Sequence, residues 1–181
     1  MDIETLLAES AIRSLLYRYC RGIDRRQLDD VRACYHENGT DHHGDFYGSA
    51  DEFIEYVRAA APRFERSMHF TGNMLIEVDG DKARVESYVL AYCHMAANET
   101  LPTRDNLVAL RYVDDVTKVD GEWKILHRKC VYEWTRTDNV VPGWDFSEHF
   151  QRGTITREDP VYWESVGGPP DVVIAPVPRD I

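Results

Sequence analysis

The stretch LIEVDGDKARVESYVLAY, residues 75–92, decides the fold class. Apolar and polar residues alternate on both sides of Asp79-Gly80, which is the pattern of two half-buried strands joined by a tight turn. An Asp-Gly pair is a strong hairpin signal, because both central positions of such a turn need positive φ. The pattern returns around Asp120-Gly121 in VDGEWKILHRKCVYEW, residues 119–134. The second half therefore predicts an antiparallel meander, with strands over 73–78, 82–95, 106–117 and 122–135.

The first half has a helical period instead. Apolar residues over 3–23 recur at helical spacing and predict one long helix ending near Gly22–Asp24, with Gly22 as its stop signal. A short helix is expected over 28–35. Ser49-Ala50-Asp51-Glu52 is a capping box that opens a further helix, which stops before Pro62. Helices followed by a meander predict an α+β fold, with helices packed on one face of a curved sheet.

The chain has 181 residues, which suits one domain. Periodicity is lost after Thr137, and residues 138–181 hold most of the eight prolines. We expect a folded domain over 1–137. The remainder, 138–181, is expected to form an extension that wraps over this domain or over a neighbouring subunit.

Charge and composition narrow the function classes. The net charge of −11 argues against nucleic acid and anionic membranes as partners. The N-terminus lacks a basic region and a cleavage site, so no signal peptide is predicted and the expected location is the cytoplasm. The four cysteines form no CxxC pair and lie in apolar segments, which predicts reduced thiols rather than disulfides or a zinc site.

Asp24 and His69 are the first candidates for chemistry. Asp24 follows the apolar stripe of the first helix, and Tyr19 lies five residues before it. The functional interpretation is a carboxylate that orients a histidine; the alternative is a solvated helix end beside Arg25 and Arg26. His69 lies between a helix and the first long strand, among apolar neighbours. It is either a proton carrier or a core histidine bonded to backbone.

Two strands add further candidates. Strict alternation places His94 on one face with Tyr88 and Tyr92, which suits either a binding cavity or cross-strand packing. Arg128 alternates with Tyr132 and Trp134. A cation on an apolar strand face needs a partner, either a substrate oxygen or a carboxylate such as Asp24.

Asp41, His42, His43 and Asp45 have the residue types of metal ligands. On a strand, however, Asp41 and His43 face one way and His42 the other. Two ligands on one face are a weak metal signal, so we predict no metal site. The sequence also lacks a phosphate-binding glycine loop, a GxSxG elbow and a Rossmann fingerprint.

These motifs together resemble the SnoaL-like group of the nuclear transport factor 2-like superfamily. The resemblance rests on Tyr19-x4-Asp24, His69, the DHHG segment at 41–44 and the two hairpins, and it covers about residues 5 to 165. It implies a cone-shaped α+β barrel. Within the superfamily the pattern is similar to scytalone dehydratase, bile acid 7α-dehydratase, hexachlorocyclohexane dehydrochlorinase and lyases of lignin-derived diarylpropanes.

The resemblance implies a site and a reaction. Asp24 and His69 match an Asp–His dyad, while Tyr19 and His94 match further catalytic positions. The expected substrate contacts are Arg128, Tyr92, Tyr88, Tyr132, His43, Phe53 and Trp134. The implied protein is a homotrimeric lyase without a cofactor. It would act as a dehydratase or carbon–carbon lyase on a hydrophobic aromatic or polycyclic hydroxylated molecule, in the catabolism of aromatic compounds.

Two other functions share this fold. One is a non-catalytic binding protein or a structural partner similar to the small subunit of ring-hydroxylating dioxygenases, which loss of Asp24 and His69 would favour. The other is an isomerase of the ketosteroid type, which would need a carboxylate base on the sheet, and no clear match is present. Fold alone does not decide among them.

Overall fold

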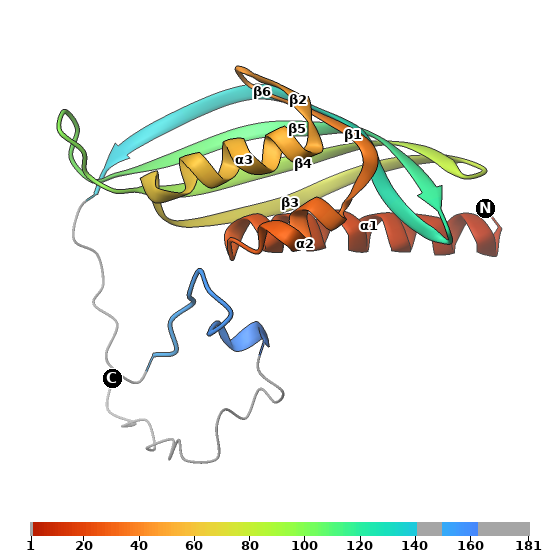
Figure 1. Ribbon diagram of the computed structural model, residues 1–181, viewed down its shortest axis with the longest axis horizontal. Coiled ribbons are helices and arrows are strands. Elements are labelled where there is room, and N and C mark those ends of the chain that lie inside the picture. Colours follow the sequence, from red (N-terminus) through yellow and green to blue (C-terminus); the bar gives the residue numbers. More distant parts are fainter. Residues whose placement is uncertain (1, 141–149, 163–181) are drawn as a thin grey trace, which may run out of the picture.

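A computed structural model describes residues 2–140 and 150–162 of the chain. Three helices and a sheet form the body of the molecule, and Figure 1 shows the sheet arching over the helices. In chain order the elements are α1 (Ile3–Asp24), α2 (Leu28–Ala33), β1 (Tyr35–His43), β2 (Phe46–Ser49), α3 (Ala50–Ala60), η1 (Ala61–Arg63), β3 (Phe64–Asp79), β4 (Lys82–Met95), β5 (Arg104–Val119), β6 (Glu122–Asn139) and η2 (Pro160–Tyr162).

The sheet has six strands in the order β2-β1-β6-β5-β4-β3. Strands β3 to β6 form the predicted antiparallel meander. Strand β1 runs parallel to β6, so the sheet is mixed, and it does not close into a barrel. The α+β class with helices against a curved sheet is confirmed.

The first helix ends within the predicted range, but not at its expected stop signal. Helix α1 begins at the Asp2 cap, whose carboxylate accepts from the Thr5 amide at 2.8 Å, and it ends at Asp24. Gly22 lies inside the helix and is not its stop signal. A Cβ on Gly22 would lie 2.7 Å from the Cγ2 atom of Val31, so the missing side chain lets α2 pack closely against α1.

The two hairpins use their Asp-Gly pairs differently. Asp120 and Gly121 both have positive φ, 51° and 85°, as the sequence predicts. In the other hairpin the turn residues are Gly80 and Asp81, since Asp79 pairs with Lys82. Only Gly80 has positive φ there, 58°, so the expectation for Asp79 is wrong.

Strand β3 begins earlier than the alternation of apolar residues indicates. It starts at Phe64, directly after the short turn η1, and His69 therefore lies within the strand rather than before it. The preceding helix α3 has both bonds of the predicted capping box: the Ser49 hydroxyl accepts from the Glu52 amide, and the Glu52 carboxylate accepts from the Ser49 amide. The helix ends before Pro62, as predicted.

Two bulges in β6 change which face its side chains occupy. The pairing with β5 skips Leu126 and Glu133. Asp115 pairs with His127 and Val116 with Ile125, so Leu126 has no partner. Ala109 pairs with Trp134 and Leu110 with Tyr132, so Glu133 has none. Each extra residue reverses the alternation. Ile125 and Arg128 consequently both point inward, at 0% and 2% exposure. Trp134 points outward, away from the face of Tyr132.

The core lies between the helices and the inner face of the sheet. Ile12, Leu15 and Leu16 of α1 pack in one cluster with Val85 and Ile125 of the sheet, and all five are at most 1% exposed. Burying each such side chain contributes about 1.5–3 kcal/mol. Among the helices of residues 2–140 and 150–162, none is long and apolar enough to span a membrane.

Candidate functional site

Asp24 lies at the end of α1 and faces the start of β3. Its side chain is buried, and three groups donate hydrogen bonds to it. The Ser67 hydroxyl donates to Oδ1 at 3.0 Å, and the His69 backbone amide donates to Oδ2 at 2.9 Å. The His69 ring contacts Oδ1 through Nδ1 at 2.7 Å. The carboxylate is therefore held in one orientation, and the alternative of a solvated helix end is excluded.

This contact fixes the chemistry of the His69 ring. A carboxylate only accepts hydrogen bonds, so Nδ1 of His69 carries the hydrogen. In the neutral ring Nε2 is then the basic nitrogen. The side chain of His69 is 12% exposed, which keeps it accessible to a small molecule. The pair has the arrangement in which an acidic residue orients a histidine for proton transfer.

The Asp24 carboxyl is ionised in this environment. Burial raises its pKa, but contacts with the His69 ring and amide and with Ser67 lower it further than burial raises it. The net pKa lies below the usual value of 3.8. The carboxylate therefore keeps its charge at neutral pH and stabilises positive charge that develops on His69.

A cavity of about 330 Å³ lies between the helices and the sheet beside His69. Its walls are mostly apolar or aromatic, with a few polar groups, as is typical of small-molecule sites. The lining residues are Ile23, Arg26, Leu28, His43, Phe53, Tyr56, Val57, Ala60, Ala61, Arg63, Phe64, Ser67, His69, Ala91, Cys93, Val108, Leu110, Tyr112 and Tyr132. A second hollow of about 270 Å³ touches both Asp24 and His69 from the side of Tyr17 and Phe70.

Three of the expected substrate contacts lie in this cavity wall. The His43 ring stacks on Phe53, with centroids 5.4 Å apart and an interplanar angle of 25°, and meets Tyr132 edge to face at 6.3 Å. These rings come from β1, α3 and β6. The structure thus brings His43, Phe53 and Tyr132 together with His69 around one cavity.

Arg128 and Tyr19 lie in the core and do not line this cavity. The Arg128 guanidinium donates to both Asp114 oxygens, at 2.8 and 2.7 Å, and both side chains have 0% exposure. It stacks between the rings of Tyr19 and Tyr112, 4.1 and 4.0 Å from their centroids. Of the two partners expected for Arg128, the structure shows a carboxylate, that of Asp114 rather than Asp24. The substrate contact expected for Arg128 and the catalytic position expected for Tyr19 do not lie at this cavity.

Tyr88, Tyr92 and His94 lie on the outer face of the sheet, opposite the face expected. The inner residues of β4 are the intervening ones, such as Val89 and Ala91, because α1 packs against that face. Periodicity of two identifies two faces but does not say which one is buried. Trp134 is also on the outer face, because of the bulge at Glu133.

His94 has its own acidic partners there. Its Nδ1 lies 2.6 Å from Asp105 Oδ1, which also accepts from the Tyr92 hydroxyl at 2.8 Å. Its Nε2 lies 3.4 Å from Glu65 Oε2. These contacts join the ends of β3, β4 and β5 and explain why a histidine occupies this position without any contact to the cavity.

Several groups at the site carry no sequence signal. Ser67 and Cys93 line the cavity, yet the pattern alone gave neither a role. Arg26 adopts positive φ, 53°, and its guanidinium donates to the carbonyls of Ala61 and Phe64. It thereby holds the end of α1 against the start of β3. A non-glycine residue in this conformation cannot be recognised from its residue type.

Asp41, His43 and Cys130 form the one group of possible metal ligands found among residues 2–140 and 150–162. Their donor atoms lie within 4.8 Å of one another. Cys130 comes from β6, far from the DHHG segment in sequence. All four cysteines are free, as predicted.

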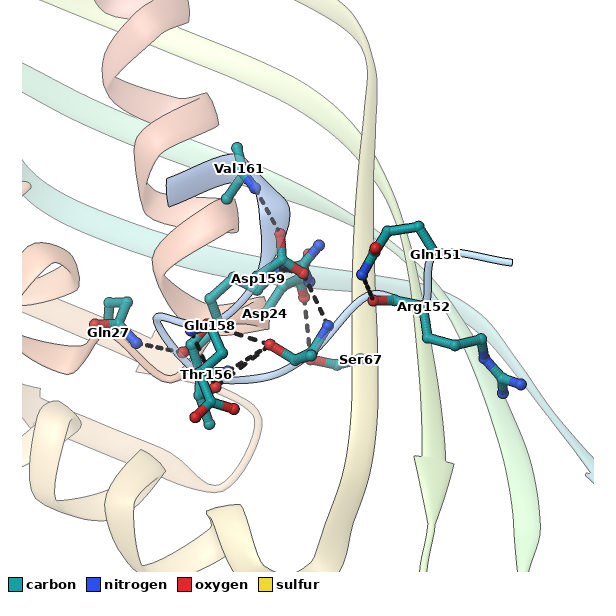
Figure 2. A network of polar contacts seen from close by, with 11 residues as sticks. Asp24, Gln27, Ser67, Gln151, Arg152, Thr156, Glu158, Asp159 and Val161 are labelled. Carbon is teal, nitrogen blue, oxygen red and sulfur yellow. Dashed lines mark hydrogen bonds and ion pairs between the residues drawn. The ribbon is translucent and has the colours of Figure 1, made fainter. Parts of the chain in front are cut away.

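Residues 150–162 contact the end of α1, close to the dyad. Figure 2 shows this segment beside α1, with Asp159 accepting from the Val161 amide at 3.1 Å. Asp159 also pairs with Arg25 of the α1 C-cap at 3.1 Å. The wrapping expected for 138–181 stays a prediction, since residues 141–149 and 163–181 lie outside the described residues.

Comparisons with known proteins address the family. Residues 4–129 match the SnoaL-like domain. A search of curated proteins finds no match. Among solved structures, a scytalone dehydratase-like protein from Novosphingobium aromaticivorans is 24% identical, with 76% of this chain and 91% of that chain covered and a TM-score of 0.66.

Two further structures have the same fold. A hexachlorocyclohexane dehydrochlorinase from Novosphingobium barchaimii is 21% identical, with 78% and 100% coverage and a TM-score of 0.68. A Mycobacterium tuberculosis protein of unknown function is 26% identical, with 72% and 74% coverage and a TM-score of 0.63. Since the family match spans more than half of the chain, this protein belongs to the SnoaL-like domain family.

Proposed function

We propose that the protein is a lyase that eliminates water, or a comparable leaving group, from a small hydrophobic aromatic molecule. The observation that carries this proposal is the position of His69, with Nδ1 bonded to a buried carboxylate and the ring facing an apolar cavity. A dehydratase-like and a dehydrochlorinase neighbour share the fold, and their reactions agree with an elimination.

The proton steps follow from this geometry. Nε2 of His69 removes a proton from a carbon next to an activating group, and the C–H electron pair forms the new double bond. The leaving group departs with its bonding electrons, and the imidazolium supplies the proton that converts hydroxide to water. Asp24 keeps its charge throughout and stabilises the imidazolium. Each such general acid–base step contributes about 10²–10⁴-fold to the rate.

The cavity limits the substrate. Its volume of about 330 Å³ is near the lower end of the range for small-molecule sites. This favours a small aromatic molecule over a polycyclic one. His43 and Tyr132 line the wall and offer polar atoms to a substrate oxygen.

The test is a screen of hydroxylated aromatic compounds with the full-length protein, following loss of water by mass spectrometry. We expect His69→Ala to lower the turnover of any substrate found by at least about 100-fold. The control is His127→Ala, since His127 is exposed and bonds Thr40 on the opposite face, and it should leave the rate unchanged. Undiminished turnover by His69→Ala would reject His69 as the base. Binding without turnover by the unaltered protein would favour a non-catalytic binding protein.

A further inference from the structure

Asp41, His43 and Cys130 meet where β1 runs parallel to β6. Asp41 pairs with Arg128 in this register, so the inner-facing residues two positions later, His43 and Cys130, are also neighbours. Cys130 Sγ lies 3.1 Å from His43 Nδ1, which lies 3.5 Å from Asp41 Oδ1. One oxygen, one nitrogen and one sulfur donor therefore converge within 4.8 Å.

The Asp41 carboxylate lacks a partner on the side of this cluster. Asp41 is 0% exposed, and its Oδ2 accepts from the Tyr35 hydroxyl. Its Oδ1 is buried and has no hydrogen-bond partner among the described residues. A buried acceptor left unsatisfied is costly, so this oxygen requires a donor or a cation.

The local charge also favours a cation. Arg128 is neutralised by its paired contact with Asp114. Asp41 adds a second buried carboxyl group beside this pair. A divalent ion bound by an Asp41 carboxylate and a Cys130 thiolate would bring the sum of the charges to zero.

We propose that Asp41 Oδ1, His43 Nδ1 and Cys130 Sγ bind one divalent transition-metal ion, with zinc as the best match. Thiolate, imidazole and carboxylate together suit zinc, whereas magnesium and calcium prefer oxygen ligands alone. The separations of 3.1 Å between Cys130 and His43 and of 3.5 Å between His43 and Asp41 suit two donors on one tetrahedral ion. Asp41 Oδ1 and Cys130 Sγ, which lie within 4.8 Å, move closer together when the ion binds. Binding breaks the Cys130 S–H bond, releases its proton to solvent, and uses the thiolate electron pair to bind the ion.

The surroundings of the cluster hold the ligands in place. The His43 ring is fixed by stacking on Phe53, and the Tyr35 hydroxyl orients the Asp41 carboxylate. Among the three ligands, His43 also lines the cavity beside His69. Metal binding here does not depend on the proton steps assigned to Asp24 and His69.

Cobalt substitution tests the site without any enzyme assay. The full-length protein is stripped with a chelator and titrated with Co²⁺. We expect one ion per chain and a near-ultraviolet absorption band from thiolate-to-cobalt charge transfer, which Zn²⁺ abolishes on displacement. Cys130→Ser should remove this band. Cys93→Ser is the matched control, because Cys93 lines the same cavity outside the cluster, and it should retain the band.

Two further variants distinguish loss of metal binding from loss of the dyad and from misfolding. His69→Ala should bind Co²⁺ with the unaltered spectrum, so loss of the proposed lyase activity and loss of metal binding are distinguishable. Tyr35→Phe should keep the band but weaken Zn²⁺ binding about 10–100-fold, as changes to outer ligand contacts do. Absence of the charge-transfer band in the unaltered protein, or an identical band in Cys130→Ser, would overturn the proposal.

Discussion

Asp24 is the residue on which the orientation of the dyad depends. It accepts one hydrogen bond from Ser67 and two from His69. A hydrogen bond to a charged group contributes about 1.5–3 kcal/mol to stability, as measured by substitution. We expect Asp24→Asn to lower the free energy of unfolding by an amount in this range at neutral pH, measured by urea denaturation.

The same variant gives a pH signature. The pKa of Asp24 is lowered in the folded protein, so its contribution to stability is complete above the unfolded pKa and is lost as pH falls through the folded pKa. The stability difference between Asp24→Asn and the unaltered protein should therefore be constant above about pH 5 and shrink below about pH 4. A difference that stays constant down to pH 3 or so would contradict the lowered pKa.

Asp114 tests the core placement of Arg128. Asp114→Ala leaves the Arg128 guanidinium buried and unpaired, which should cost about 3–5 kcal/mol of stability. The neighbouring Asp115 pairs with Arg84 in solvent, with side chains 45% and 59% exposed, so Asp115→Ala should cost at most about 1 kcal/mol. Equal costs for the two variants, measured by thermal and urea unfolding, would contradict the buried pair.

For single residues, the sequence predicts a role only where the spacing along the chain determines which side chains become neighbours. Asp24 and His69 were identified through a resemblance, and the structure brings them into contact. The partner of Arg128 could not be chosen, because several carboxylates were available and the register was unknown. Cys130 could not be linked to Asp41 and His43 for the same reason, since the parallel pairing of β1 with β6 has no local signal.

Among the elements, the positions of the two hairpins and the Ser49 cap were predicted because they depend on local backbone chemistry, whereas the Asp79 turn conformation and the Gly22 stop signal were not. The strand β4 has the predicted bounds, and the Ser49 capping box is present. The bulges at Leu126 and Glu133 were not predictable, because an extra residue leaves the composition of a strand unchanged. The face predicted for Trp134 was wrong because of the second bulge, at Glu133.

Gly121 provides the test of the β5–β6 turn. It has φ of 85°, and a Cβ built there would meet nothing within 4 Å, so any cost of Gly121→Ala comes from the backbone alone. We expect a loss of about 1–2 kcal/mol in the free energy of unfolding. The control is Gly72→Ala in β3, where only ordinary contacts at 3.8 and 4.0 Å would form. Equal stability of Gly121→Ala and the unaltered protein would exclude the left-handed turn.

On the scale of the whole molecule, the outer face of the sheet carries large exposed apolar side chains. Phe70, Tyr88 and Trp134 are 64%, 51% and 50% exposed, and they line one groove of about 700 Å³. Exposed apolar patches of this kind mark association surfaces. We propose that copies of the chain cover this face in the homotrimer that the family resemblance implies.

Sedimentation equilibrium checks this expectation. The unaltered protein should sediment as a trimer, and Trp134→Glu should shift it toward monomer, because burying the new charge between subunits is unfavourable. His127→Glu places the same charge on another exposed residue of β6 and should leave the trimer intact. A monomeric unaltered protein would contradict the proposal.

Proton removal by His69 is the central claim, and hydrogen exchange measures it without requiring a leaving group. An aromatic ketone that binds in the cavity is incubated in D₂O with the protein, and deuterium uptake at the carbon beside the carbonyl is followed by NMR. The unaltered protein should catalyse this exchange, and His69→Gln should bind the ketone with similar affinity but exchange at least about 100-fold more slowly. Exchange at an unchanged rate in His69→Gln, or no exchange by the unaltered protein with the ketone bound, would contradict the account.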